Sequence, residues 1–332
     1  MQVWKKPFAV VKKRQFRSIS KVMKKTIPVF FAADENYVPF LGVTLVSIKK
    51  YANPKYQYKI HVLYTGELAD NAEKIKTMQT ENVTVEFNDI SEKAAQIQGV
   101  MRCRDYYTSA IYFRLFIPDL FPQYEKAIYL DCDTVLLEDI AKLYEIDIER
   151  NYIGAVADQA VAAVDAFRLY VKNALDIEPE KYFNSGVIVL NLNELRKINF
   201  YQTFYSILDS YDFTVAPDQD CLNLICKDRV YYYGAEWNKM PTGGLNGETP
   251  KLIHYNLAMK PWHYDGVLFE DYFWEYAKQT PFYNTILAEK QAFTPQMAMR
   301  DKIGGEKLLA LASSEAENPD NYIRTVRKKE SK

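Results

Sequence analysis

Short apolar runs rich in β-branched and aromatic residues recur along the chain, and segments with helical spacing of apolar residues lie between them. Runs of this kind are typical of strands buried on both faces of a sheet. The sequence predicts strands at 26–33, 58–64, 83–88, 126–130, 152–158, 186–192 and 252–255. It predicts helices at 37–51, 70–80, 108–116, 199–210, 218–226 and 269–290. Because strands that alternate with helices form βαβ units, we expect an α/β fold with a parallel sheet.

The length of 332 residues suits one large α/β domain or two smaller ones. A chain of this size buries a core without disulfide or metal cross-links, so reduced, intracellular thiols are expected. The cysteines form no CxxC pair, and they are Cys103, Cys132, Cys221 and Cys226. The formal net charge is −1, which gives no overall basic field, so nucleic acid is not an expected partner.

The first 25 residues form a basic segment with nine Lys or Arg residues and no acidic residue. The segment lacks the apolar core and small-residue cleavage site of a secretory signal. Two interpretations stay open, a leader that lies on anionic lipid and a disordered, solvated leader. No run of about 18 apolar residues is present, so we expect no transmembrane helix.

Acidic residues follow several of the predicted strands. Asp34, Asp131 and Asp158 each end an apolar run. In open α/β sheets, ligands bind beyond the carboxyl ends of the strands. Asp131 and Asp133 are two residues apart, a spacing that lets both carboxylates reach one hard cation. The alternative is a turn in which the acids cap a helix.

Two basic side chains and one histidine are further candidates. His254 ends a predicted strand and is either a third metal ligand or a satisfied core histidine. An imidazole beside two carboxylates favours Mn²⁺ over Mg²⁺. Lys260 and Arg114 suit phosphate oxygens, and their alternatives are a solvated lysine and an internal ion pair. No glycine-rich phosphate loop is present, so a metal and basic side chains must hold any diphosphate.

In chain order, six segments resemble glycosyltransferase family 8, the family of bacterial lipopolysaccharide galactosyl- and glucosyltransferases and of glycogenin. The segments are FAADENY (31–37), YFRLFIP (112–118), YLDCDTVLLEDI (129–140), FNSGVIVLNL (183–192), PDQDCLN (217–223) and HYNLAMKPWH (254–263). The resemblance covers roughly 26–265. It implies a GT-A type α/β fold, a single Rossmann-like mixed sheet flanked by helices.

The resemblance also implies roles for individual residues. The metal ligands are Asp131, Asp133 and His254. The donor-binding residues are Ala32, Asp34 and Asn36 for the base and ribose, Arg114 and Lys260 for the phosphates, and Asn184 for the sugar. Asp158 contacts the donor sugar, and Asp218 and Gln219 lie beside the reacting carbon. One departure is that YNLAM, between His254 and Lys260, has no glycine.

The activity implied by the resemblance is that of a retaining hexosyltransferase. It would move glucose or galactose from a UDP-sugar to a glycan, glycolipid or glycoprotein, with Mn²⁺ or Mg²⁺ stabilising the UDP leaving group. We expect a basic leader at 1–25, a GT-A catalytic domain at 26–280 and a C-terminal helical extension and tail at 281–332. We expect a cytoplasmic protein, with the leader as its contact with the inner face of the membrane.

Three rival functions stay open at this stage. LDCDTVL resembles the nucleophile motif of haloacid-dehalogenase-type phosphatases, but it lies in mid-chain and no later paired-acid segment follows. A nucleotidyltransferase that makes UDP-sugars would carry a glycine-rich phosphate loop near its N-terminus. A noncatalytic carbohydrate-binding relative would keep the fold but lose the acids, whereas Asp131, Asp133 and His254 are intact.

Overall fold

The computed structural model describes residues 24–97, 99, 109–242 and 249–330. The prediction for a leader at 1–25 therefore falls almost wholly outside the described residues. So does Cys103, whereas the other three cysteines are buried free thiols. Among the described residues, no helix is both long enough and apolar enough to cross a membrane.

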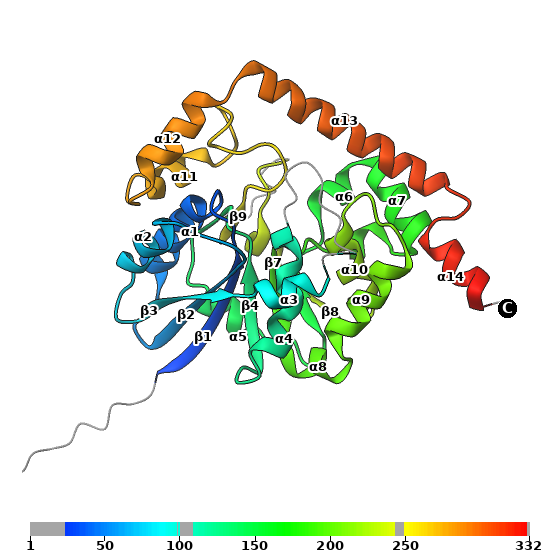
Figure 1. Cartoon of the computed structure of the whole chain (residues 1–332), viewed down its shortest axis with the longest axis horizontal. Helices are drawn as coiled ribbons and strands as arrows, with labels where there is room; N and C mark the ends of the chain where they lie inside the picture. Colours follow the sequence, from blue (N-terminus) through cyan, green and yellow to red (C-terminus); the bar gives the residue numbers. More distant parts are fainter. Residues whose placement is uncertain (1–23, 98, 100–108, 243–248, 331–332) are drawn as a thin grey trace, which may run out of the picture.

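A seven-stranded sheet forms the centre of the molecule, in the order β3-β2-β1-β4-β7-β6-β8 (Figure 1). Its strands are β1 (Lys25–Ala32), β2 (Tyr56–Tyr64), β3 (Val83–Asp89), β4 (Lys126–Leu130), β6 (Ile153–Ala155), β7 (Val187–Asn191) and β8 (Val230–Tyr232). The strands from β3 to β4 are parallel, but β7 is antiparallel to both β4 and β6. The strand pattern alone predicted a parallel sheet, because an apolar run reveals burial but not strand direction; the mixed sheet that the resemblance implied is the one present.

A second, two-stranded sheet matters for the site. β5 (Thr134–Leu136) pairs antiparallel with β9 (Leu252–His254), and this register sets Thr134 opposite His254. The backbone N–H of Tyr255 donates to the carbonyl oxygen of Asp133 over 2.9 Å. This pairing brings together two segments that are about 120 residues apart in the sequence.

Helices cover both faces of the central sheet, and apolar cores lie between helices and sheet on each side. The first face carries α1 (Val38–Tyr51), α2 (Asn71–Thr77) and α5 (Ala141–Glu145). The second face carries α3 (Ser91–Ala95), 3₁₀ helix η1 (Ser109–Phe116), α4 (Ile117–Leu120), α7 (Asp165–Leu175), α8 (Leu192–Lys197), α9 (Phe200–Ser210) and α10 (Pro217–Cys226). Short helices α6 (Gln159–Ala163), η2 (Pro179–Lys181) and η3 (Ala235–Asn238) complete this part of the chain.

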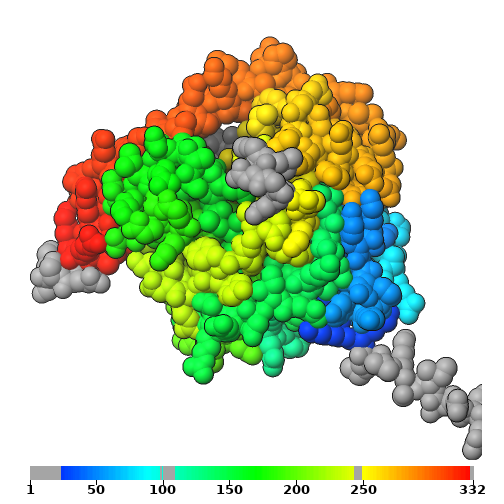
Figure 2. Space-filling model, turned by 180° about the vertical axis from the view of Figure 1, so that it is seen from behind, coloured from blue at the N-terminus to red at the C-terminus, as the bar shows by residue number. Residues whose placement is uncertain are grey.

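The C-terminal part consists of helices. They are α11 (Glu270–Ala277), α12 (Tyr283–Ala292), α13 (Pro295–Glu317) and α14 (Tyr322–Glu330). The single helix predicted at 269–290 is two helices, because Pro281 cannot continue a helix interior. α13 crosses the top of the molecule in Figure 1, and Figure 2 shows the C-terminal helices lying against the green segment that contains α6 and α7. The sequence analysis expected a helical extension at 281–332 but did not assign α13 as an individual helix within it.

Candidate active site

A pocket opens where several central strands end, as the strand-end argument predicts. Its empty volume is about 1310 Å³ with its open mouth included. Eleven of the twelve predicted site residues line it: Ala32, Asp34, Arg114, Asp131, Asp133, Asp158, Asn184, Asp218, Gln219, His254 and Lys260. The twelfth, Asn36, is exposed outside the pocket, and its backbone N–H donates to Asp34 Oδ1 over 3.0 Å.

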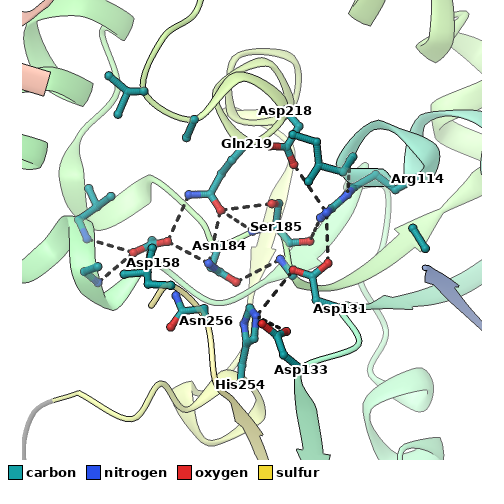
Figure 3. Close-up of a pocket in the computed structure, with 18 of the residues that line it drawn as sticks. Arg114, Asp131, Asp133, Asp158, Asn184, Ser185, Asp218, Gln219, His254 and Asn256 are labelled. Carbon is teal, nitrogen blue, oxygen red and sulfur yellow. Dashed lines mark hydrogen bonds and ion pairs between the residues drawn. The ribbon is translucent and has the colours of Figure 1, made fainter. Parts of the chain in front are cut away.

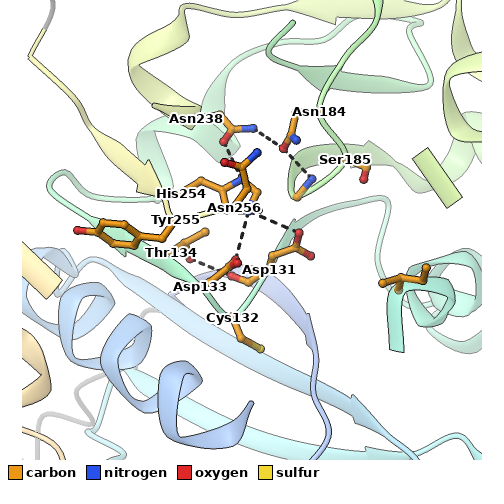
Figure 4. Close-up of polar contacts among 12 residues, drawn as sticks. Asp131, Cys132, Asp133, Thr134, Asn184, Ser185, Asn238, His254, Tyr255 and Asn256 are labelled. Carbon is orange, nitrogen blue, oxygen red and sulfur yellow. Dashed lines mark hydrogen bonds and ion pairs between the residues drawn. The ribbon is translucent and has the colours of Figure 1, made fainter. Parts of the chain in front are cut away.

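Two carboxylates and one imidazole meet at the centre of the pocket (Figures 3 and 4). Ligand atoms of Asp131, Asp133 and His254 all lie within 4.8 Å of one another. His254 Nε2 is 3.2 Å from Asp133 Oδ1 and 3.7 Å from Asp131 Oδ2. Two oxygens and one nitrogen at this spacing suit a divalent cation.

Local backbone structure brings these three residues together. Asp131 follows β4, and its N–H donates to the carbonyl oxygen of Gly186 over 2.8 Å. A Cβ on Gly186 would collide with the His254 ring and with Asp131 Oδ2. The site therefore requires a glycine at 186, because any larger residue would occupy the space between the imidazole and the carboxylate.

The His254 ring is held by a residue that the sequence analysis missed. His254 Nδ1 lies 3.0 Å from the side-chain oxygen of Asn238, in η3. The Asn238 Nδ2 donates to Asn184 Oδ1 over 2.9 Å, which leaves its own oxygen free to accept from the imidazole (Figure 4). The proton is therefore assigned to Nδ1, and the Nε2 lone pair faces the carboxylates. Asn238 is the last residue of the segment AEWN, which matches none of the motifs considered, so nothing in the sequence indicated its role.

Asp133 is buried and is paired with only one of its two oxygens. Lys260 Nζ donates to Asp133 Oδ2 and, over 2.5 Å, to the carbonyl oxygen of Tyr255. Asp133 Oδ1 is buried with no hydrogen-bond partner. Burial raises the pKa of Asp133, but nearby positive charge, chiefly that of Lys260, outweighs burial and holds that pKa below its usual value. An ionised, half-paired carboxylate fits a cation ligand, because an unpartnered buried oxygen is otherwise costly.

Arg114 joins the metal-ligand region to the start of α10. Its guanidinium is 3.2 Å from Asp131 Oδ1 and 3.6 Å from Asp218 Oδ2. It also donates to the carbonyl oxygen of Ser185 and lies over the Tyr129 ring at 4.2 Å. The buried arginine is thus satisfied by internal partners, as one of the two sequence interpretations held.

A network of polar side chains lies beside the three candidate ligands, and we call it the polar network: Asp158, Asn184, Ser185 and Gln219 (Figure 3). Asp158 Oδ2 accepts from Asn184 Nδ2 over 3.0 Å and from Gln219 Nε2 over 3.2 Å. Asp158 Oδ1 accepts from the first N–H groups of α6, so this residue also caps that helix. The Gln219 oxygen accepts from the Ser185 N–H over 2.9 Å.

Two buried carboxyls in α10 have raised pKa values. Burial raises the pKa of Asp218 to about 6, although Arg114 lowers it. Burial raises the pKa of Asp220 to about 7, although hydrogen bonds from Tyr182 and Tyr170 lower it. Asp218 lines the pocket, whereas Asp220 lies behind it.

Tyr37 and Leu257 also line the pocket, and the sequence analysis assigned neither of them. Leu257 lies in the glycine-free segment YNLAM and has φ of 58°, in the left-handed region. That conformation is one that glycine adopts without strain and leucine does not. The backbone shape expected of a glycine is therefore present without the glycine.

The chain is similar to known glycosyltransferases in sequence. The model of glycosyl transferase family 8 matches residues 28–266. General stress protein A of Bacillus subtilis (strain 168) is 31% identical over 257 residues, covering 70% of this chain and 85% of that protein. The lipopolysaccharide 1,2-glucosyltransferase of Escherichia coli (strain K12) is 28% identical over 274 residues, covering 76% of this chain and 78% of that protein.

Solved structures agree on the architecture. The apo structure of the bifunctional glycosyltransferase WbbM has a TM-score of 0.70 and 26% identity, covering 82% of this chain and 53% of that one. The galactosyltransferase LgtC, in complex with donor and acceptor sugar analogues, has a TM-score of 0.67 and 24% identity, covering 77% and 96% of the two chains. The expected GT-A architecture, a mixed sheet flanked by helices, is confirmed.

Proposed function

Because the chain belongs to glycosyl transferase family 8, we propose that it transfers a hexose, glucose or galactose, from a UDP-sugar donor to a glycan, glycolipid or glycoprotein acceptor. One observation supports this proposal most strongly. Asp131, Asp133 and His254 direct two oxygens and one nitrogen at a common point, and the buried Asp133 Oδ1 has no hydrogen-bond partner. Such an arrangement suits a divalent cation beside a diphosphate.

Asp131, Asp133 and His254 are the residues that we assign to the metal. An imidazole beside two carboxylates favours Mn²⁺, with Mg²⁺ as the alternative. When bound, the cation supplies Lewis-acid stabilisation to the departing diphosphate. Asn238 keeps the Nε2 lone pair of His254 directed at that point.

The donor is assigned to the surrounding residues. Lys260 is buried beside Asp133, and its ammonium suits the phosphates as a point charge. Ala32, the last residue of β1, and Asp34 line the pocket. We assign them, with Asn36, to the base and ribose. Arg114 is bound to internal partners, so its contact with the donor is assigned as an indirect one that holds Asp131 in place.

The donor sugar is assigned to the polar network, with Asn184 and Asp158 as its contacts. Asp158 accepts with both oxygens, so it is better placed to position neighbours than to attack a carbon. Gln219 is a neutral amide whose oxygen accepts from Ser185 and whose nitrogen donates to Asp158. Asp218 is paired with Arg114 at 3.6 Å. These features favour retention by internal return. The C1–phosphate bond breaks, the acceptor oxygen bonds to C1 on the same face, and the departing phosphate oxygen takes the acceptor proton.

The rival functions find less support. A phosphatase of the haloacid-dehalogenase type would carry its nucleophile on the first strand and a paired-acid segment later in the chain, whereas Asp131 follows β4 and the sequence has no such segment. A noncatalytic relative has no need of a buried oxygen such as Asp133 Oδ1 without a partner. We also propose that 26–280 form the catalytic domain and 281–332 a helical extension. The leader at 1–25 is proposed as a peripheral contact with the inner face of the membrane.

Release of UDP from a panel of UDP-hexoses, with Mn²⁺ and with a chelator, tests the proposal. We expect Mn²⁺-dependent turnover of UDP-glucose or UDP-galactose. Asp133→Ala should lower it about 100-fold or more, because metal stabilisation of the leaving group contributes several kcal/mol. The control is Asp209→Ala, an exposed acid on α9, which should match the wild type. Turnover by Asp133→Ala within about threefold of the wild type would contradict the metal assignment.

A further inference from the structure

One side of the pocket is formed by apolar side chains, in contrast with the polar network. We call it the apolar wall, and it consists of Val161, Phe167, Val171, Val215 and Leu308. These residues come from α6, α7, the segment before α10, and α13. Among the described residues that line this side, none directs a charged side chain into the pocket.

Two tyrosines that line the pocket beside the apolar wall turn their hydroxyl groups away from it. The Tyr170 hydroxyl donates to Asp220 over 2.8 Å, and the Tyr182 hydroxyl donates to Asp220 over 2.6 Å. Asp220 is fully buried behind the pocket. Both tyrosines are themselves buried, so they offer the pocket no free hydroxyl group on this side.

Asp158 marks the boundary between the two sides of the pocket. Its Oδ2 accepts from Asn184 and Gln219 in the polar network. Its Oδ1 accepts from the N–H groups of Ala160 and Val161, where α6 and the apolar wall begin (Figure 3). A sugar bound by the polar network is thus adjacent to the apolar wall, whose described residues offer further hydroxyl groups no side-chain partner. A buried, unpaired hydroxyl is unfavourable, whereas an alkyl or aryl group is stabilised there.

The outermost member of the apolar wall comes from outside the family match, which ends at residue 266. Leu308 lies on α13 and packs against the same core as α7. The next residue, Leu309, is exposed and does not line the pocket. The chain thus completes its pocket with a helix beyond the part that defines the family.

We infer that the apolar wall binds an alkyl or aryl aglycone of the acceptor. The enzyme should therefore prefer hexosides with an apolar aglycone over free hexoses and methyl hexosides. This inference rests on the proposed function and narrows its acceptor. The shared chemistry is an apolar group attached to a sugar. An alkyl chain corresponds to a lipid-linked saccharide and an aryl group to an aromatic glycoside.

The first experiment uses the full-length wild type with Mn²⁺ and its UDP-hexose. Methyl, octyl and phenyl β-glucosides and β-galactosides are added below their micelle-forming concentrations, and UDP release is measured. A glycoside that binds at the pocket changes this rate, whether it accepts the hexose or blocks the site. The half-effect concentration is the glycoside concentration that gives half of the maximal change in rate. It should be at least about tenfold lower for the octyl or phenyl glycoside than for the methyl glycoside, because burial of only two methylene groups already gives about a tenfold gain in affinity.

Variants at adjacent positions of α13 identify the surface responsible. Leu308→Ser should raise the half-effect concentration of the preferred glycoside about threefold or more and leave that of the methyl glycoside within twofold. Leu309→Ser, a matched change on the exposed side, should alter neither. Thermal melting checks that both variants are folded.

The results distinguish failure of the proposed function from failure of the aglycone preference. No UDP release from any UDP-hexose by the wild type would remove the proposed function and this inference with it. UDP release with equal half-effect concentrations for methyl, octyl and phenyl glycosides would overturn the inference alone. Equal effects of Leu308→Ser and Leu309→Ser would show that the preference arises elsewhere and would overturn the role of the apolar wall. The wild-type comparison decides the matter even if Leu308→Ser does not fold.

Discussion

At the scale of single residues, the candidate site depends on groups that orient other groups. His254 is held through Nδ1 by Asn238, which is in turn held by Asn184. Such outer contacts fix the tautomer and ring orientation of a metal ligand and affect affinity strongly.

Asn238→Ala removes the acceptor for His254 Nδ1. We expect Mn²⁺ affinity to fall about 10- to 100-fold, because the ring loses its fixed tautomer and orientation. Titration calorimetry with Mn²⁺ and UDP measures the change. Asn256→Ala is the matched control, because Asn256 also lines the pocket but donates to Met240 and not to His254. Equal affinity in the two variants would contradict the role of Asn238.

Asp220 gives a prediction about stability and pH. Burial raises its pKa to about 7, so the folded protein retains a proton that the unfolded chain releases near pH 4. The stability contributed by this proton is fully present below pH 4 and is lost as pH rises through 7. Relative to Asp220→Asn, the wild type should therefore lose free energy of unfolding between pH 4 and 8. Denaturant titrations at several pH values measure this difference, and parallel curves for the two proteins would refute it.

At the scale of helices and strands, long apolar runs were predictable and short elements were not. The strands β1, β2, β3, β4 and β7 were predicted within one or two residues, because each is at least five residues long and lies in an apolar run. β5 and β8 have only three residues each and were missed, whereas β6 and β9 are equally short and were predicted from the apolar segments around them. The β5–β9 pairing sets Thr134 opposite His254 and so brings the preceding Asp133 close to the imidazole; the sequence could propose the ligands but not the pairing that joins them.

α13 was missed for a different reason. Few of its residues are buried, and Gly304 and Gly305 interrupt its interior. Glycine weakens a helix interior, and a helix with a narrow buried stripe has little apolar periodicity. Its packing against α7 is a tertiary effect that no local pattern reports.

Gly305→Ala should stabilise the protein. A Cβ at this position meets no atom within 4 Å, so alanine gains about 0.5–1 kcal/mol from helix propensity without a clash. Gly42→Ala, the same change in the interior of α1, would set a Cβ 2.7 Å from the Phe282 ring and should destabilise. Thermal melting of the two variants checks both signs. A lower melting temperature for Gly305→Ala would contradict the account of α13.

At the scale of the whole molecule, the sequence pattern predicted which strand ends would meet at the pocket but not which strands are parallel and which are antiparallel. Asp34, Asp131 and Asp158 line one pocket, as the open α/β architecture requires. The antiparallel β7 supplies Asn184, Ser185 and Gly186 from its amino end, so its polar residues reach the same pocket as the carboxyl ends of its neighbours. α13 supplies Leu308 to the apolar wall, so the motifs alone could not predict this side of the pocket.

The central claim is that Asp131, Asp133 and His254 together hold a divalent cation. A crystal grown with Mn²⁺ and UDP, with data collected at the manganese absorption edge, tests it most directly. We predict an anomalous peak within bonding distance, about 2.0–2.4 Å, of His254 Nε2 and of one oxygen from each carboxylate. UDP bound in the pocket with no such peak, or with a peak that His254 does not contact, would contradict the account.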